Sequence, residues 1–365
     1  MASDGAVRRQ RASAAVDLQI GQRRIRLSNP DKVLYPRTGF TKRQVVDYYV
    51  AVAPHLLPHL KDRPVTLKRY PDSTAGPFFY EKDAPTFTPE WVKTFPVPRR
   101  GSGPAIHYIV INDVATLAWC ATLANLEVHP FLHRVPRLHT PTAVVFDLDP
   151  GEGANILTCG EVAVLLQQAL AGVGLQAFLK VSGSKGLQLH VPLNTPTTYA
   201  QTGHFALVTA QALERAHPQL IVTDMAKVRR TGKVFIDWSQ NSDYKTTVSV
   251  YSLRAKRDQP FVSLPVRWDE LEGAGKNANR LYFDVDTTLR RLADVGDLFR
   301  PVLRLKQRLP QVSRAGRGRP RNLAKTPQRA PVVPRTSRQG AGAGWSSRSM
   351  PPAAARDSAL ARPRG

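Results

Sequence analysis

One short stretch, TAVVFDLDPG at residues 142–151, constrains the fold more than any other part of the sequence. A run of apolar and small residues that is closed by Pro-Gly is typical of a buried β-strand. Residues i and i+2 of a strand face the same side, so Asp147 and Asp149 should project together from its end. Two carboxylates this close repel each other unless a cation lies between them. The stretch therefore predicts a buried strand that presents a pair of acids at an open site.

A second strand-like run, KVFIDW at residues 233–238, also leads into an acid, Asp237. If the two strands are neighbours, Asp147, Asp149 and Asp237 form a three-carboxylate cage. Such a cage suits two hard divalent cations, Mg²⁺ or Mn²⁺, which can polarise the attacking and leaving oxygens of an in-line displacement. We therefore predict that the three aspartates are catalytic metal ligands.

A glycine-rich turn, KVSGSKG at residues 180–186, follows another predicted strand. Glycines let backbone N–H groups approach phosphates, and Lys185 adds a positive charge. The spacing is not that of a Walker A loop. Arg230 and Arg254 flank the third acid in the sequence, and arginine forks suit a triphosphate.

The remaining apolar patterns alternate between helices and strands. Thr41 is expected to cap a helix that ends or bends at Pro54, and Thr158 with Glu161 is expected to form a capping box. Strands are expected at 64–70, 175–181, 187–193, 234–238 and 246–253, and further helices from residue 112 and at 204–216. This order predicts an α+β fold with a central, mainly antiparallel sheet.

Charge divides the chain unevenly. Of the net charge of +24, the segment 304–365 carries +14, from fifteen Lys/Arg and one acid. We expect a flexible basic N-terminus at 1–20, a catalytic domain at 21–305, and a disordered tail rich in Pro, Arg, Gly and Ala at 306–365. A protein this basic is expected to bind a polyanion, and the tail to add affinity without specificity.

Two cysteines, Cys120 and Cys159, lie in apolar helical patterns without CxxC spacing, which argues against a disulfide framework or a zinc site. The sequence shows neither a signal-peptide pattern nor an apolar run that could span a bilayer. These features predict a cytoplasmic, nucleoid-associated protein.

Several segments together resemble the polymerase domain of bacterial ligase D and its stand-alone relatives, in the archaeo-eukaryotic primase superfamily. They are NPDKVLYPRTGFTK, RPVTLKRY, FFYEK, LEVH, VVFDLDPGEG, SGSKGLQLH, GKVFIDWSQN and YSLR, and the resemblance covers roughly residues 27–309. It implies the primase-polymerase fold and a DNA-dependent nucleotidyltransferase that extends a 3′-hydroxyl with NTPs or dNTPs.

The resemblance also implies residue roles. The implied nucleotide-binding residues are His129, Ser182, Lys185, Gln188, His190, Arg230, Gln240 and Arg254. Lys32 and Lys42 match lysines that hold a 5′-phosphate at a gap or broken end. Lys68 joins them as a DNA-binding candidate, and Phe79 with Tyr80 matches an aromatic pair that packs on the template base.

The sequence departs from the family pattern at Gln188, where histidine is usual, and at Tyr80, where phenylalanine is usual. His190 shares a strand face with Gln188 and could partly replace the missing histidine. The resemblance is confined to the polymerase domain, so a ligase and an end-binding protein are expected as separate partners.

Two other classes of protein share some of these features. A haloacid-dehalogenase-type phosphatase also places Asp-X-Asp after an apolar strand, although Pro150 is atypical there. A non-catalytic nucleic-acid-binding protein would explain the positive charge but not three aspartates at strand ends.

Overall fold

The strand that carries the acid pair is the middle strand of a five-stranded sheet. The computed structural model describes residues 14–257 and 259–310. β12 (Ala143–Pro150) pairs antiparallel with β14 (Leu187–Pro192) on one side and with β16 (Val234–Asp237) on the other. The outer strands are β13 (Phe178–Val181), antiparallel to β14, and β15 (Ile221–Val222), parallel to β16. This arrangement confirms the predicted α+β fold with a mainly antiparallel central sheet.

A second, fully antiparallel sheet is built around β5 (Pro64–Arg69), which forms pairs with three other strands. These are β6 (Phe79–Glu81), β8 (Ile106–Val110) and β9 (Asn125–Pro130), and β7 (Thr94–Val97) pairs with β8. Short two-stranded pairs complete the strands: β1 (Val16–Ile20) with β2 (Arg23–Leu27), β3 (Val33–Tyr35) with β4 (Phe40–Thr41), β10 (His133–Arg134) with β11 (Arg137–Pro141), and β17 (Leu253–Arg254) with β18 (Phe261–Val262).

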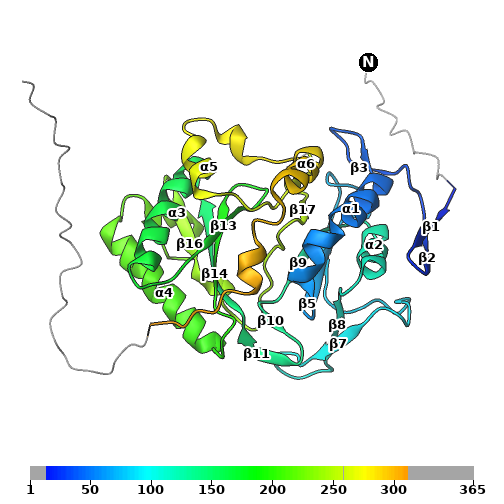
Figure 1. Ribbon diagram of the computed structural model, residues 1–365, viewed down its shortest axis with the longest axis horizontal. Helices are drawn as coiled ribbons and strands as arrows, with labels where there is room; N and C mark the ends of the chain where they lie inside the picture. The colour runs from blue at the N-terminus through cyan, green and yellow to red at the C-terminus, as the bar shows by residue number, and fades with distance from the viewer. Residues whose placement is uncertain (1–13, 258, 311–365) are drawn as a thin grey trace, which may run out of the picture. The chain divides into compact units, whose positions relative to one another are not determined.

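Helices cover the two sheets on opposite sides of the domain (Figure 1). α3 and α4 pack on the β12 sheet, whereas α1 and α2 lie beside β5 and β9. Their bounds are α1 (Lys42–Leu60), α2 (Val114–Thr122), α3 (Ile156–Ala171), α4 (Tyr199–Ala216), α5 (Trp268–Gly273) and α6 (Val285–Val295). Short 3₁₀ turns follow at η1 (Lys227–Arg230), η2 (Trp238–Gln240), η3 (Ala278–Leu281) and η4 (Arg300–Leu303).

Helix ends match the sequence in part. Thr41 caps α1 as predicted, but the helix continues past Pro54 to Leu60. The capping box of α3 lies three residues earlier than predicted: Asn155 is the cap and Thr158 is its partner, in place of Thr158 with Glu161. An asparagine side chain is as good a cap as a threonine, so the two positions compete in the sequence.

The segment 246–253 was expected to be a strand and is mostly irregular. Thr247 and Ser249 donate backbone hydrogen bonds to Pro130 and Val128 of β9, at 3.1 and 2.9 Å. The return bond from the Val128 N–H goes instead to the Ser252 hydroxyl, at 2.9 Å. The ladder therefore stops, and the strand β17 begins only at Leu253.

The expected chain ends also differ from the structure. Val16–Ile20, placed in the flexible N-terminus by its polarity, forms a hairpin with β2, and Leu18 and Ile25 reach the core. Residues 306–310 have no regular structure, but Gln307 donates hydrogen bonds to backbone oxygens of Gln176, Pro192 and Leu193. The rest of the predicted flexible ends, 1–13 and 311–365, lies outside the described residues.

Cys120 and Cys159 are both buried in helices and free, as their apolar surroundings predict. In the described part of the chain, no helix is both long and apolar enough to cross a membrane.

Candidate active site

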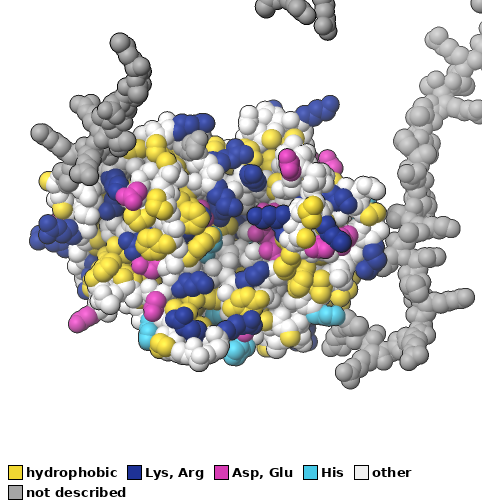
Figure 2. All heavy atoms as spheres, turned by 180° about the vertical axis from the view of Figure 1, so that it is seen from behind, with side chains coloured by type: hydrophobic (Ala, Val, Ile, Leu, Met, Phe, Trp, Pro, Cys, Tyr) yellow, Lys and Arg dark blue, Asp and Glu magenta, His cyan; other side chains and the backbone are white. Residues whose placement is uncertain are grey.

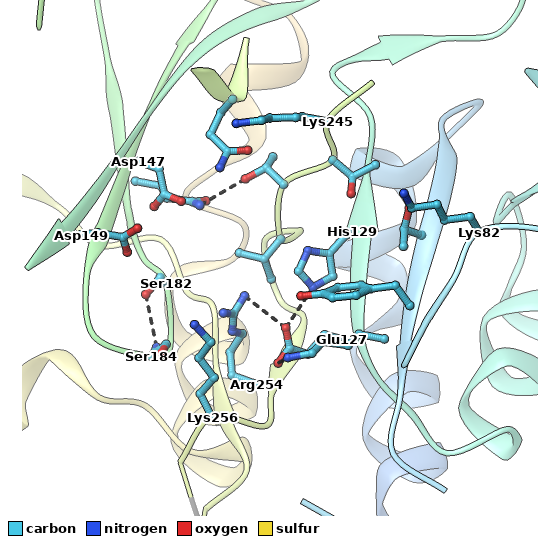
Figure 3. Close-up of a pocket in the computed structure, with 18 of the residues that line it drawn as sticks. Lys82, Glu127, His129, Asp147, Asp149, Ser182, Ser184, Lys245, Arg254 and Lys256 are labelled. Carbon is cyan, nitrogen blue, oxygen red and sulfur yellow. Dashed lines mark hydrogen bonds and ion pairs between the residues drawn. The ribbon is translucent and has the colours of Figure 1, made fainter. Parts of the chain in front are cut away.

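The inner faces of the two sheets meet at a cleft of about 420 Å³. Asp147 and Asp149 lie on one wall, and Glu127 and His129 of β9 lie opposite, with Arg254 between the walls (Figure 3). Further charged side chains at the cleft are Lys82, Lys245 and Lys256. A volume of this size is typical of a small-ligand site.

The acid wall is arranged as the sequence predicts. Asp147 and Asp149 alternate with the buried residues Phe146 and Leu148 along β12, so both carboxylates face the cleft. Asp237 of β16 is the direct cross-strand partner of Asp147. Directly opposed residues of an antiparallel pair share a face, so the backbone brings all three aspartates to one side of the sheet.

The Asp237 carboxylate is nevertheless turned to local partners. One oxygen accepts hydrogen bonds from the backbone N–H and hydroxyl of Ser239, at 2.9 and 2.5 Å. The other accepts a hydrogen bond from Gln240 at 3.0 Å. In the described chain, no three acidic, histidine or cysteine side chains converge to hold a metal ion. The acid pair on β12 is therefore formed, and Asp237 stands beside it.

The electrostatics of the pair favour a cation. Desolvation in the cleft raises the pKa of Asp147. The charges of the nearby Asp149 and Asp237 raise this pKa further, to about 7, although Gln188 donates a hydrogen bond. Desolvation and Asp237 also raise the pKa of Asp149, against the effect of Lys256. Oxygen ligands that are hard to ionise together fit a divalent cation, which would stabilise both charges.

The opposite wall is organised by Glu127, a buried acid that our sequence reasoning missed. Its carboxylate lies 2.9 Å from His129, 3.4 Å from Arg254 and 3.5 Å from Lys68. It also accepts a hydrogen bond from the Ala255 N–H at 3.1 Å. Burial alone would raise the pKa of Glu127, but Arg254, His129 and Lys68 together hold it below its usual range.

This network explains where two predicted residues lie. His129 is held against Glu127 at the cleft, and burial lowers its pKa despite that acid. Lys68 is only 2% exposed, and its charge is compensated by Glu127. Lys68 therefore lies buried at the cleft, and its contact with DNA stays a prediction. The motif LEVH held a usable signal, because Glu127 and His129 share a strand face whereas Leu126 and Val128 point into the core.

The glycine-rich turn lies at the edge of the cleft but is closed on itself. Ser182 Oγ accepts hydrogen bonds from the N–H groups of Ser184 and Gly186, both at 3.2 Å. Gly183 has a φ of 68°, and a Cβ there would lie 2.7 Å from the Val262 oxygen, so a side chain has no room. Ser182 lines the cleft, whereas Lys185 is exposed outside it.

Gln188 and His190 lie in different places. Gln188 is buried against Asp147 and donates to the Thr247 hydroxyl at 3.1 Å. His190 lines a separate cavity of about 50 Å³ with His59 and Arg63. His190 lies about 7 Å further along the strand and does not line the cleft. Its replacement of the usual histidine stays a prediction.

Two further predicted residues, Gln240 and Arg230, lie beside the acid wall. Gln240 lines the cleft and donates a hydrogen bond to Asp237. Arg230 donates to the Met225 oxygen at 2.6 Å and stacks over the Phe235 ring at 3.6 Å. It does not line the cleft, although its charge lowers the pKa of Asp149.

Lys32 and Lys42 form a basic cluster outside the cleft. Lys42 donates to the Ser28 oxygen at 2.9 Å, and Lys32 pairs with Asp72 at 3.3 Å. Burial, Lys32 and Arg69 lower the pKa of Lys42 to about 8. Mutual repulsion of this kind favours an anion, and Arg69 is a member of the cluster that the sequence did not reveal.

Phe79 and Tyr80 are exposed on β6, by 44% and 53%. They do not form one surface: Tyr80 lines the cleft, with its ring 6.1 Å from that of His129, whereas Phe79 packs against Arg69. Tyr80 instead shares its face with Phe78, and their ring centres lie 5.9 Å apart.

An α+β fold whose cleft combines paired acids on one sheet with several cations around them fits a metal-dependent nucleotidyltransferase. Residues 41–299 match the family model for the LigD primase-polymerase domain. The chain belongs to this family, and it is a nucleotidyltransferase domain of the primase-polymerase type. That membership sets aside the phosphatase and the non-catalytic binding protein.

The sequence relatives are longer proteins than this chain. The multifunctional non-homologous end joining protein LigD of Mycolicibacterium smegmatis is 42% identical over 286 residues, which are 76% of this chain and 36% of the relative. The multifunctional non-homologous end joining DNA repair protein LigD of Mycobacterium tuberculosis is 39% identical over 326 residues, 86% of this chain and 41% of the relative. The chain thus spans less than half of their length.

A solved structure is similar in fold to this chain. It is the polymerase domain of Mycobacterium tuberculosis ligase D in complex with DNA. The two chains share 41% identity and a TM-score of 0.71, over 76% of this chain and 97% of the other.

Proposed function

We propose that this domain extends the 3′-hydroxyl end of a DNA strand with nucleoside triphosphates, at gaps or broken ends during non-homologous end joining. The observation that carries this proposal is the cleft with two acids on one wall and Arg254, Lys245, Lys256 and Lys82 around it. A triphosphate bound with divalent cations has the charge pattern that complements these walls. The relatives carry names that describe them as non-homologous end joining proteins.

In this proposal Asp147 and Asp149 hold two divalent ions, Mn²⁺ or Mg²⁺, with Asp237. When bound, such ions would polarise the reacting hydroxyl and stabilise charge on the triphosphate. Asp237 would have to turn from Ser239 and Gln240 to take part.

The protein's own groups would bind and orient the nucleotide. Arg254, fixed by Glu127, and Ser182 would contact the phosphates, and His129 would lie near the sugar. Gln188 would hold Asp147, because it is anchored by Thr247. Lys185, Gln240 and Arg230 would support the phosphates and the acid wall from the periphery.

The ends of the DNA would be held outside the cleft. Lys32 and Lys42 would grip a 5′-phosphate, with Arg69 behind them. Tyr80, at the cleft mouth, would stack on the template base, and Phe79 would contact the neighbouring strand. A separate ligase would seal the product, an end-binding protein would recruit the domain, and the nucleoid would be its place of action.

Extension of a gapped duplex tests the proposal directly. The assay compares gaps with and without a 5′-phosphate, NTP with dNTP, and Mg²⁺ with Mn²⁺. We expect metal-dependent extension that is stronger on the 5′-phosphorylated gap. Absence of extension under every one of these conditions would contradict the proposal.

A further inference from the structure

A second charged pocket lies apart from the cleft. It has a volume of about 730 Å³ and lies between the β10–β11 hairpin and the segment 303–306. Four cations line it: Arg134, Arg137, Arg304 and Lys306. It shares no lining residue with the catalytic cleft. Figure 2 shows basic side chains gathered at the lower edge of the molecule, the edge where β10 and β11 lie in Figure 1.

The charge of this pocket is uncompensated. Within the described ranges, none of its four cations lies within ion-pair distance of a carboxylate. The acid in its lining, Asp62, is already bonded to Asn112 at 2.9 Å and paired with Lys93 at 3.5 Å. The Nε of Arg134 is buried and has no hydrogen-bond partner in the described structure. These features indicate a site for an anion.

Both sides of the pocket are held in place. The hairpin is tied down by the His133 ring, 2.9 Å from the Tyr199 hydroxyl, and by the Val135 N–H, 2.8 Å from the Asp62 oxygen. The opposite side is held by Asn194, which donates to the Val302 and Leu305 oxygens at 3.0 and 2.8 Å. A backbone that is fixed before binding positions these cations, so less entropy is lost when an anion arrives.

We propose that this pocket binds a backbone phosphate of the DNA that flanks the reaction site. The volume exceeds what one free phosphate would fill, and the exposed Arg308 follows Lys306 in the described chain. A polymer can contact several cations of this segment together, whereas a single phosphate cannot. Contacts of this kind add affinity and salt dependence without sequence preference.

Charge reversal in the pocket tests this inference. The double variant Arg137→Glu with Lys306→Glu changes two exposed residues in the full chain. Binding is measured against salt on two gapped duplexes, one with long flanks and one with flanks too short to leave the cleft. On the long duplex we expect Kd to rise about tenfold or more and the slope of log K against log salt to weaken by about 0.9, from one lost phosphate contact. The short duplex and the nucleotide KM should be unchanged.

Lys276→Glu is the matched control, because this exposed lysine follows α5 at the opposite end of the domain from β10 and β11. Equal weakening by the control, or equal weakening on both duplexes, would overturn the inference. Titration with inorganic phosphate tests whether the pocket binds free phosphate instead of DNA. Saturable phosphate binding, together with an unchanged affinity of the double variant for the long duplex, would also overturn the inference. These readouts are of binding, so they stand even if extension itself fails.

Discussion

Replacing Glu127 with glutamine should damage stability and nucleotide binding together. Glutamine keeps the shape of the side chain but removes the charge that compensates Lys68 and Arg254, at 3.5 and 3.4 Å. Glu127 and Lys68 are 1% and 2% exposed, so water cannot replace the lost carboxylate. The variant therefore leaves buried cations without a partner.

The magnitude follows from this burial. Breaking one side of a buried ion pair costs about 3–5 kcal/mol. The loss should be near the lower end, because burial lowers the pKa of Lys68 and lets it lose its proton. For a domain of this size we expect the melting temperature to fall by roughly 6–10 °C. Nucleotide KM should rise roughly tenfold to a hundredfold, as for the loss of one charged hydrogen bond that orients Arg254 or His129.

Two assays separate the effects: thermal unfolding without ligand, and primer extension at varied nucleotide concentration. Glu270→Gln is the control, because it breaks the ion pair between Glu270 on α5 and Arg291 on α6, outside the cleft. The control should lower stability modestly and leave KM unchanged.

A second change makes the reasoning sharper. Adding Lys68→Met to Glu127→Gln removes one uncompensated cation, so stability should return toward wild type while KM stays high. The role of Glu127 is refuted if Glu127→Gln has the melting temperature and the nucleotide KM of the wild type. It is also refuted if the double variant restores both properties at once.

Three other predictions concern the acids, the 5′-phosphate site and the tail. Asp147→Ala should abolish extension and leave DNA affinity within about twofold, as measured by primer extension and fluorescence anisotropy; surviving extension would remove the acid pair from the mechanism. The preference for a 5′-phosphorylated over a 5′-hydroxyl gap should fall as pH rises from about 7 to 9, because Lys42 is charged below its pKa of about 8 and neutral above it. Lys42→Arg should keep the preference across that range, and the same decline in this variant would contradict the assignment. Removing residues after Pro310 should weaken the salt slope of DNA binding without changing nucleotide KM; an unchanged slope would show that the tail's charge does not contact DNA.

Local patterns predicted the acid wall well. The strand predicted at 142–147 and the shared face of Asp147 and Asp149 follow from the twofold period of a strand, which needs no tertiary information. Asp237 could be identified as a strand-end acid, but its register opposite Asp147 depends on which strands pair. The predicted strand at 246–253 is mostly absent for a related reason. The Val128 N–H donates to the Ser252 hydroxyl and not to a backbone oxygen, so the β-ladder does not continue.

The residues that face the acid pair across the cleft could not be predicted from local patterns. Glu127, Lys68 and Arg254 come from three separate strands, and in the sequence each is an ordinary charged residue. Gln188 and His190 share a strand face, and only the tertiary structure shows that Gln188 lines the cleft whereas His190 lines a neighbouring cavity.

The sequence by itself determined the α+β class, the acid pair and, through its resemblance, the primase-polymerase family. These depend on periodicity and on runs of neighbouring residues, which are local properties. The tertiary structure alone decided that Glu127 organises the facing wall, that Lys68 is buried, and that cations from β10, β11 and the segment 303–306 share one pocket. Burial and charge compensation depend on which distant segments meet, and no local pattern carries that information.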